Sequence, residues 1–248
     1  MGQPVVVITG ALTGIGRASA VAFAHEGARL VVSGRREAEG KALEAELQRL
    51  GVEAAFMVAD VRHEDDVRHV VDRTVARFGR LDVAVNTAGT EGQPGPILEQ
   101  TAESYAATFD TNVLGTLLSM KHELRVMLAQ GRGSIINVSS TFGQRGGVGA
   151  AVYAASKHAV EGLTQSAALE AAGAGVRVNV VAPGPIDTGM LTRFTGTDAR
   201  KAALIAGVPL QRVGRPEEIA QVIVFLASDK SAFITGATIA VDGGKTAL

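Results

Sequence analysis

Short apolar runs alternate with amphipathic stretches along the whole chain. The first run, 5–8, is a continuous series of β-branched residues, which is typical of a strand buried on both faces. Further runs predict strands at 29–33, 54–59, 81–85, 133–139, 176–181 and 237–241. Helical spacing of apolar residues predicts helices at about 15–26, 37–50, 64–78, 102–130, 152–169 and 217–227. This alternation predicts an α/β fold with a doubly wound parallel seven-stranded sheet flanked by helices.

The chain shows no sign of division into domains. No segment rich in proline, serine or one sign of charge divides the 248 residues, so one domain is expected over 1–248. Hydrophobic residues make up 46% of the chain, with 30 glycines and only 4% aromatic residues. This composition predicts a core of small aliphatic side chains, as a parallel sheet between alanine-rich helices requires.

The charge balance excludes several classes of partner. A net charge of −1 provides no excess of positive charge for binding nucleic acid or an anionic membrane surface. No apolar run approaches the length of a membrane-spanning helix. Residues 1–4 lead directly into a strand, without the charged region and cleavage site of a signal peptide, which predicts a cytoplasmic protein.

Side chains that bind metal ions are scarce. The chain has no cysteine, so disulfides and thiolate metal sites are impossible. The five histidines lie far apart and are expected at the surface: His25, His63, His69, His122 and His158. We therefore expect no metal site, and a zinc-dependent dehydrogenase is excluded.

A glycine-rich segment follows the first strand at once. Gly10, Gly14 and Gly16 lie between strand 5–8 and a helix that begins near residue 15, so the amides of this turn face a helix N-terminus. Glycines permit a tight bend and a close approach of a ligand to the backbone. Any tight connection can use glycine, but this position after the first strand predicts a pyrophosphate site and a single-domain Rossmann fold.

The end of the second strand bears on the choice of dinucleotide. In a dinucleotide-binding fold an acidic residue here would bind the 2′-hydroxyl of NAD and repel the 2′-phosphate of NADP. In this chain Ser33 and Gly34 precede two cations, Arg35 and Arg36. Guanidinium groups suit a phosphate. The sequence therefore favours NADP, with NAD as the alternative if these arginines merely cover the surface.

A phenol and an ammonium group occupy positions suited to proton transfer. Tyr153 and Lys157 are four residues apart in the helix expected at 152–169, within about 6 Å on one helix face. A fixed cation favours the phenolate and is expected to lower the pKa of the tyrosine. Ser140, at the carboxyl end of the fifth strand, is a second hydroxyl candidate. Because the same spacing occurs by chance in ordinary amphipathic helices, the pair indicates a catalytic site only in combination with the other motifs.

Other polar or loop-forming residues follow the remaining strands. Asp60 could contact an adenine amino group or cap the next helix. Asn112 interrupts a mostly apolar helical face, where asparagine is more often structural than catalytic. Prolines at 183 and 185 predict a loop beside the cofactor. The mixed composition of about 187–209 predicts a mobile segment that covers the substrate.

In this order the motifs resemble those of the short-chain dehydrogenase/reductase (SDR) family, over the whole chain. The segment 10–16 looks like the family's cofactor turn, and 86–89 (Asn-Thr-Ala-Gly) resembles its motif after the fourth strand. Two departures are visible. Thr87 replaces the second asparagine that the family usually has, and Thr13 stands where many NADP-using members carry a basic residue.

The resemblance implies roles for individual residues. Tyr153 would be the general acid in ketone reduction and the base in alcohol oxidation, and Ser140 would hold the substrate oxygen. Lys157 would bind the nicotinamide ribose and lower the pKa of the tyrosine, while Asn112 would support a water-linked proton path. Besides Tyr153 and Lys157, the cofactor would contact Gly10, Thr13, Gly14, Ile15, Gly16, Ser33, Arg35, Arg36, Asp60, Val61, Asn86, Ala88, Gly89, Pro183, Gly184, Ile186 and Thr188.

The function predicted on this basis is hydride transfer between NADP(H) and a ketone or secondary alcohol. A mostly apolar or small set of pocket residues favours a neutral substrate of modest size: Ser140, Phe142, Gln144, Tyr153, Pro185, Leu191 and Phe194. A 3-oxoacyl thioester of fatty-acid synthesis is an alternative substrate, and a non-catalytic nucleotide-sensing module is an alternative from another functional class. The region 150–172 is apolar on more faces than one sheet covers, which, with the resemblance, predicts a homotetramer.

Overall fold

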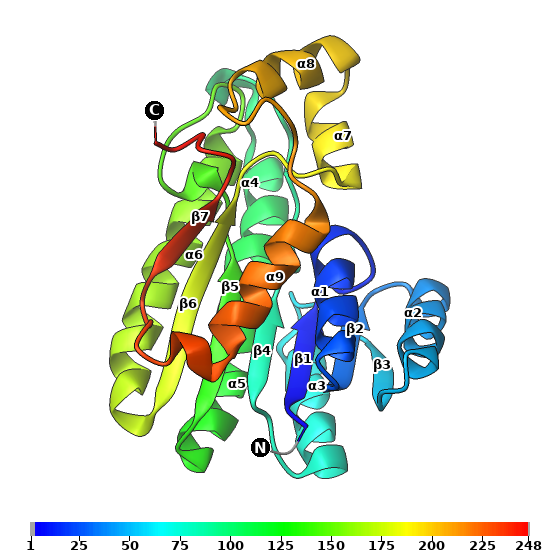
Figure 1. Ribbon diagram of the computed structural model, residues 1–248. Coiled ribbons are helices and arrows are strands. Elements are labelled where there is room, and N and C mark those ends of the chain that lie inside the picture. The colour runs from blue at the N-terminus through cyan, green and yellow to red at the C-terminus, as the bar shows by residue number, and fades with distance from the viewer. Residues whose placement is uncertain (1–2, 248) are drawn as a thin grey trace.

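The computed structural model describes residues 3–247 and contains a parallel sheet of seven strands in the order β3-β2-β1-β4-β5-β6-β7 (Figure 1). This sheet confirms the predicted α/β Rossmann architecture. The order reverses between β1 and β4, and open α/β sheets bind ligands at such a reversal, beyond the carboxyl ends of the strands. The strands are β1 (Val5–Thr9), β2 (Arg29–Gly34), β3 (Ala54–Val58), β4 (Val83–Asn86), β5 (Gly133–Val138), β6 (Val176–Pro183) and β7 (Thr238–Val241).

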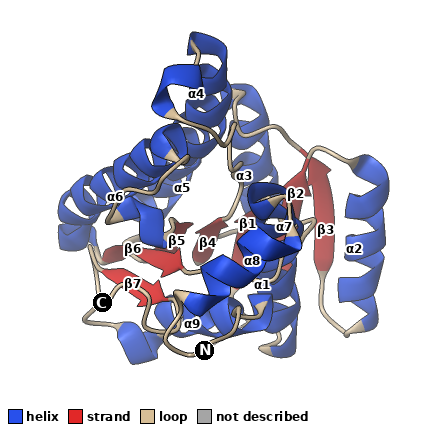
Figure 2. Cartoon of the chain, turned by 90° about the horizontal axis from the view of Figure 1, so that it is seen from above, coloured by secondary structure: helices blue, strands red, loops and turns tan. Residues whose placement is uncertain are grey.

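Helices cover both faces of the sheet (Figures 1 and 2). One layer shares a hydrophobic cluster with the sheet and consists of α1 (Gly14–His25), α2 (Glu37–Arg49) and α9 (Pro216–Ala227). The other layer shares a second cluster and consists of α3 (Glu64–Phe78), α5 (Gly115–Gln130) and α6 (Ala151–Ala171).

The first strand shows why the sheet needs apolar residues on both faces. Val6 and Ile8 belong to the cluster beneath α1, α2 and α9, whereas Val7 belongs to the cluster beneath α3, α5 and α6. None of the three is more than 1% exposed. Burial of one such side chain stabilises the fold by roughly 1.5–3 kcal/mol. The continuous β-branched run therefore fixes the strand that leads into the glycine turn.

The helical region expected over 102–130 is interrupted. α4 (Ala102–Phe109) passes into a π-helical turn, Asp110–Leu114, before α5 begins. The hydroxyls of Thr101 and Ser104 form a capping box that fixes the start of α4. π-helical turns often occur at functional positions, and this one contains Asn112.

The segment around 187–209 contains two short helices that lie beyond the carboxyl ends of the strands (Figure 1, top). These are α7 (Gly189–Thr195) and α8 (Asp198–Ala206). Each begins at a threonine cap: the Thr188 hydroxyl accepts from the Leu191 amide at 3.4 Å, and Thr197 likewise caps α8. The predicted role of this segment as a substrate cover stays a prediction.

One histidine differs from the expected surface position. His122 is 5% exposed, because α5 packs on α3, and its Nε2 lies 3.1 Å from Glu64 Oε1. The other four histidines are exposed. Among residues 3–247, no group of three or more metal-binding side chains comes together.

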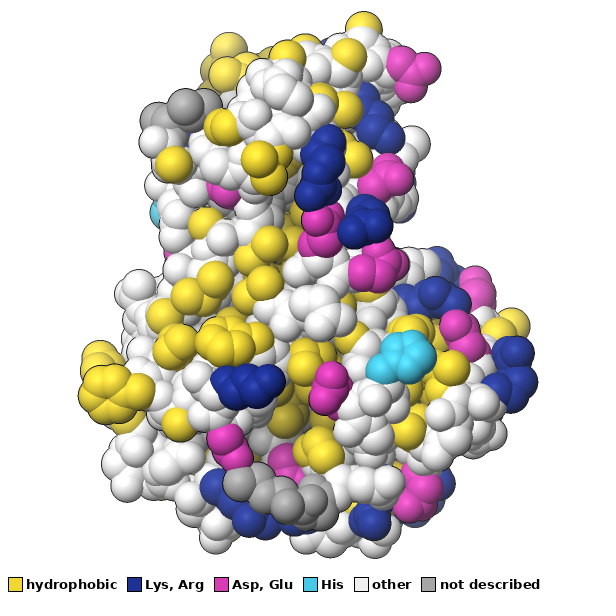
Figure 3. All heavy atoms as spheres, in the orientation of Figure 1, with side chains coloured by type: hydrophobic (Ala, Val, Ile, Leu, Met, Phe, Trp, Pro, Cys, Tyr) yellow, Lys and Arg dark blue, Asp and Glu magenta, His cyan; other side chains and the backbone are white. Residues whose placement is uncertain are grey.

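On the face seen from the side of α9, acidic and basic side chains are intermixed mainly on the right, and hydrophobic side chains gather over the left and centre (Figure 3). In the described part of the chain, every helix is too short or too polar to span a bilayer.

Candidate active site

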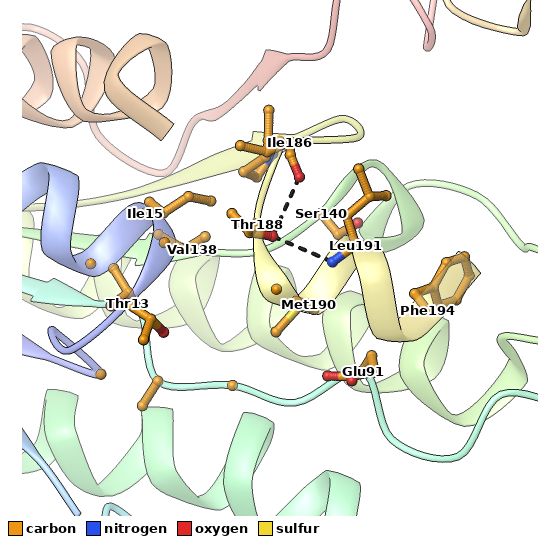
Figure 4. A pocket seen from close by; sticks show the side chains of 18 of the residues that line it. Thr13, Ile15, Glu91, Val138, Ser140, Ile186, Thr188, Met190, Leu191 and Phe194 are labelled. Atoms are coloured by element: carbon orange, nitrogen blue, oxygen red, sulfur yellow. Dashed lines mark hydrogen bonds between the residues drawn. The ribbon is translucent and has the colours of Figure 1, made fainter. Parts of the chain in front are cut away.

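A cavity of about 520 Å³ opens where the order of the sheet reverses. It extends from the turn between β1 and α1 to the helix α7. Figure 4 shows Thr13 and Ile15 on one side of it, and Ser140, Leu191 and Phe194 on the other. One continuous space therefore joins the predicted pyrophosphate turn to the predicted catalytic residues.

Two glycines of the turn have no room for a side chain. Gly10 has φ +66°, and a Cβ there would lie 2.6 Å from the backbone of Ala88. A Cβ on Gly16 would lie 2.4 Å from the Gly10 carbonyl oxygen and 2.5 Å from Thr87 Oγ1. The loop after β4 thus packs directly on the turn, so Thr87 supports the turn although it departs from the usual family motif.

The end of β2 presents two arginines to the cavity. Gly34 leaves space for the side chain of Leu12, since a Cβ there would lie 2.7 Å from it. Arg36 forms an ion pair with Glu39 at 2.8 Å, and both side chains are largely exposed. Arg35 and Arg36 line the cavity. Ser33, which the resemblance assigns to the cofactor, is 1% exposed and does not line it.

Asp60 lines the cavity and is already engaged by a cation. Its carboxylate accepts hydrogen bonds from the Arg62 side chain at 2.6–3.1 Å and from the Arg62 amide at 3.1 Å. These contacts hold the pKa of Asp60 below its usual value. The residue at the N-cap of α3 is His63, so Asp60 does not cap that helix.

Tyr153 and Lys157 face the cavity from the start of α6, and Ser140 faces it from the loop after β5. The Lys157 ammonium lies 5.7 Å from the centre of the Tyr153 ring. It donates to the Val138 carbonyl at 2.9 Å, which fixes its position. The Ser140 hydroxyl accepts from the Phe142 amide at 3.2 Å. Two hydroxyls and one cation therefore converge on one region of the cavity.

Burial dominates the proton affinities of this group. It raises the pKa of Tyr153 to about 12, an effect opposed by the Ser140 hydroxyl and reinforced by the negative charge of Glu91. It lowers the pKa of Lys157 to about 8, against the influence of Glu161. The pKa of Tyr153 is thus raised and not lowered as expected, because burial of the phenol is the largest influence on it. The phenol is therefore protonated at neutral pH, as a proton donor must be.

Asn112 lies beside this group but does not line the cavity. Its side-chain oxygen accepts from the Thr90 amide at 2.8 Å. Its side-chain NH₂ group donates to the Thr90 carbonyl at 2.9 Å and to the Ser156 hydroxyl at 3.0 Å. A Cβ on Gly89 would lie 3.3 Å from Asn112 Oδ1 and 3.6 Å from Lys157 Nζ. Asn112 thus ties the loop after β4 to α6 next to the lysine.

Asn86 is directed into the core rather than the cavity. It is 4% exposed, and its amide donates to Glu123 and to Asn137 at 3.0 Å each. Its oxygen accepts from the Thr9 hydroxyl at 3.3 Å. Asn86 therefore joins β4 to β1, β5 and α5 beneath the site.

Aromatic rings close the cavity on the side of α7. The ring of Phe142 meets that of Tyr153 edge-on, with centres 6.2 Å apart, and lies 6.1 Å from that of Phe194. Most of the predicted substrate residues line this end, whereas Gln144 is exposed and lies outside it. The cavity also contacts the loop after β6, including Pro183, Gly184, Pro185, Ile186 and Thr188.

Comparison with known proteins agrees with this architecture. Residues 10–246 match the family model described as enoyl-(acyl carrier protein) reductase. A structure of a short-chain type dehydrogenase/reductase from Mycobacterium ulcerans superposes with a TM-score of 0.95 at 33% identity, and the match covers 98% of this chain and 90% of that one. This chain belongs to the short-chain dehydrogenase/reductase family.

Two relatives of this SDR have assigned activities. Cis-4-hydroxycyclohexanecarboxylate dehydrogenase of Sinomonas cyclohexanicum is 41% identical over 246 residues, covering 99% of this chain and 98% of its own length. The 3-oxoacyl-(acyl-carrier-protein) reductase of Thermotoga maritima is 40% identical over 240 residues, covering 97% and 96%.

Two further SDR-like structures were determined with a nicotinamide cofactor. A single-residue variant of actinorhodin polyketide ketoreductase with NADPH has a TM-score of 0.93 at 34% identity, covering 98% of this chain and 97% of that one. NAD⁺-bound xylitol dehydrogenase has a TM-score of 0.94 at 33% identity, covering 97% and 98%. The chain is thus an oxidoreductase of the SDR family, and the alternative of a non-catalytic nucleotide-sensing module has no support.

Charged residues also line the cavity, and the sequence did not predict how they pair across the fold. Glu91 and Arg193 line it and form a two-point ion pair, with contacts of 2.5 and 3.1 Å. Lys245, in the turn after β7, lines it as well. No spacing rule links Glu91 to Arg193, because 102 positions separate them in the chain. Only the folded structure brings them together.

Proposed function

We propose that the protein transfers a hydride between NADP(H) and a ketone or secondary alcohol, with Tyr153 as the general acid of ketone reduction. The observation that carries this proposal is the presence of Tyr153, Ser140 and Lys157 in the cavity that begins at the glycine turn. Proton donor, oxygen-binding hydroxyl and cation then stand beside the place where a dinucleotide would end.

The residues at the other end of the cavity suit such a dinucleotide. The turn that contains Gly10 and Gly16 would let a ligand approach the amides at the start of α1, and a helix N-terminus favours a pyrophosphate. Arg35 and Arg36, without a carboxylate at the strand end, favour a 2′-phosphate. Structures of SDR relatives contain NADPH or NAD⁺, and these arginines support NADP here. When bound, the reduced nicotinamide supplies the hydride.

The chain's own groups account for the proton and the developing charge. During ketone reduction negative charge grows on the carbonyl oxygen, and the hydroxyls of Ser140 and Tyr153 can both donate to it. Tyr153 then gives its proton to that oxygen, and alcohol oxidation reverses the transfer. The Lys157 cation, 5.7 Å from the ring centre, favours the phenolate that remains. Asn112 acts on this group by holding the loop after β4 against α6.

We infer the substrate class from the residues that line the end of the cavity near α7. Phe142, Leu191 and Phe194 offer apolar surface beside the reacting hydroxyls, and aromatic and aliphatic walls suit a compact hydrocarbon ring. A relative acts on cis-4-hydroxycyclohexanecarboxylate. We therefore place this protein among SDR enzymes of cyclic ketones and secondary alcohols, with α7 and α8 covering the substrate.

A 3-oxoacyl thioester is the second candidate substrate. It is favoured by the Thermotoga maritima relative, a 3-oxoacyl reductase that covers nearly the whole chain. The two candidates share the same chemistry at Ser140 and Tyr153, so they differ only in what the far end of the cavity holds.

A rate comparison tests the proposed function. Purified protein with NADPH should reduce cyclohexanone or a substituted cyclohexanone, and oxidise the matching alcohol with NADP⁺. A kcat/KM for acetoacetyl-coenzyme A far above that for every cyclic ketone would favour the thioester. Absence of turnover with all of these carbonyl compounds would contradict the proposal.

We further propose that the protein assembles as a homotetramer. Large apolar side chains are exposed on the outer helices, including Leu117 and Leu128 on α5 at 43% and 42%, and Leu169 on α6 at 84%. Apolar groups on neighbouring helices are typical of a subunit contact.

A further inference from the structure

The cations along the cavity differ in whether they have a negative partner. Two of them form ion pairs with carboxylates: Arg36 and Arg193. Three lining cations form no ion pair among residues 3–247: Arg35, Lys157 and Lys245. The proposed function gives Arg35 a phosphate and Lys157 a phenolate. It gives Lys245 no negative partner.

Lys245 is held in place by its own turn. Asp242 accepts from the Gly244 amide at 2.9 Å and from the Thr246 amide and hydroxyl at 2.7 and 2.6 Å. The Arg145 guanidinium donates to the Lys245 carbonyl at 2.5 Å. The backbone that carries this ammonium is therefore fixed from two sides.

The turn is also packed against the segment that follows α8. A Cβ on Gly243, which has φ +66°, would lie 2.7 Å from Val208 Cγ1, and the Gly243 carbonyl accepts from the Leu210 amide at 3.2 Å. The segment that covers the far end of the cavity and the turn that carries Lys245 are thus joined. A fixed turn presents its side chain at lower entropic cost than a flexible tail would.

Among residues 3–247, no carboxylate forms an ion pair with the Lys245 ammonium. The nearest carboxylate in sequence, Asp242, is occupied by its three hydrogen bonds within the turn. Partial burial and the neighbouring charge of Arg145 lower the pKa of Lys245, against the weaker influence of Asp242. On the wall formed by α7, Arg193 already has a partner in Glu91. An anion entering from solvent would relieve this excess of positive charge.

We propose that Lys245 binds a carboxylate on the substrate, so that the substrate is a cyclic keto acid or hydroxy acid. This inference rests on the proposed function and deepens it. It also replaces the expectation of a neutral substrate, which rested on the mostly apolar or small residues predicted to line the pocket. The ring would occupy the apolar wall around Phe142 and Phe194, with the reacting carbon toward Tyr153 and the carboxylate toward Lys245.

A binding measurement tests the carboxylate site without any turnover. Cyclohexanecarboxylate has no carbonyl to reduce, so titration calorimetry in the presence of NADP⁺ measures recognition alone. Loss of one charge-assisted contact corresponds to about tenfold or more in affinity, so Lys245→Met should bind at least about tenfold more weakly than wild type. Lys245→Arg should retain most of the affinity, and Lys41→Met, which changes an exposed lysine of α2, should equal wild type. Equal affinity in wild type and Lys245→Met, or no binding by wild type, would overturn the inference.

A kinetic measurement separates recognition from structure. With 4-oxocyclohexanecarboxylate, Lys245→Met should lower kcat/KM about tenfold through KM, whereas kcat/KM for cyclohexanone should change less than about twofold. An equal loss with both ketones would show a structural role and overturn the proposal. A loss confined to acetoacetyl-coenzyme A would assign Lys245 to the phosphate of a carrier arm and also overturn it. Lysine-dependent binding of cyclohexanecarboxylate without turnover of any ketone would contradict the proposed function while supporting this site.

Discussion

Glu123 lies in the core beneath the active site and offers a sharp test of how burial controls charge here. Its side chain on α5 is 1% exposed, and its Oε2 accepts from the Asn86 amide at 3.0 Å. Burial raises the pKa of Glu123 from 4.5 to about 7. The substitution Glu123→Gln keeps the size of the side chain and an acceptor for Asn86 while removing the charge.

The size of the effect follows from the two pKa values. The difference between 4.5 and about 7 corresponds, at about 1.36 kcal/mol per pH unit, to about 3 kcal/mol. Between these pH values folded Glu123 keeps its proton while the unfolded chain releases it, so the free energy of unfolding falls as the pH rises. Most of the free-energy cost of ionising buried Glu123 is absent at pH 5 and present at pH 8. The advantage of Glu123→Gln over wild type should therefore grow by about 2 kcal/mol between pH 5 and pH 8.

Chemical unfolding in urea, followed by circular dichroism at several pH values, measures this difference. Glu170→Gln on α6 is the matched control, because it makes the same change at an exposed position. The control should show no comparable growth of the difference with pH. An advantage of Glu123→Gln that stays constant from pH 5 to pH 8, or a control that behaves in the same way, would refute the argument from burial.

Three further results are expected. Replacing Arg35 and Arg36 together by alanine should lower kcat/KM with NADP about tenfold or more relative to NAD, and an unchanged ratio of the two cofactors would show that these arginines only cover the surface. Glu91→Gln should shift the rise of the alcohol-oxidation rate with pH to lower pH, because the charge of Glu91 raises the pKa of Tyr153; an unchanged pH profile would contradict this. Light scattering at micromolar concentration should give about four times the chain mass of 25.5 kDa, and a monomeric mass would refute the tetramer.

The elements that carry the site could be predicted because local rules determine them. The run at 5–8 was predicted as a doubly buried strand, and Gly10 and Gly16 predicted a tight turn; the contacts with Ala88 and Thr87 show in addition that this turn has no room for side chains. Tyr153 and Lys157 face the same cavity because a four-residue spacing places them on one face of α6.

The direction of side chains at strand ends and the pairs formed across the fold could not be predicted in the same way. Ser33 ends one predicted strand and Asn86 directly follows another, yet both are buried and lie outside the cavity. Asn112 owes its direction to a π-helical turn that apolar spacing does not reveal. The cavity position of Lys245 depends on long-range packing of the C-terminal turn against the segment after α8.

The proton affinity of Tyr153 shows a related limit. The sequence places a cation four residues away and so predicts a lowered pKa, whereas burial of the phenol raises the pKa to about 12. Desolvation depends on everything packed around the ring, including Phe142, which no short motif contains.

The central claim is that Tyr153 carries the proton in the reaction, and Tyr153→Phe tests it most directly. The variant keeps the ring that meets Phe142 and removes only the hydroxyl. Turnover of the best carbonyl substrate with NADPH should fall by about two to four orders of magnitude, while the Kd for NADPH, measured by fluorescence titration, should change little. A variant that binds NADPH normally and retains a near-normal rate would contradict the account.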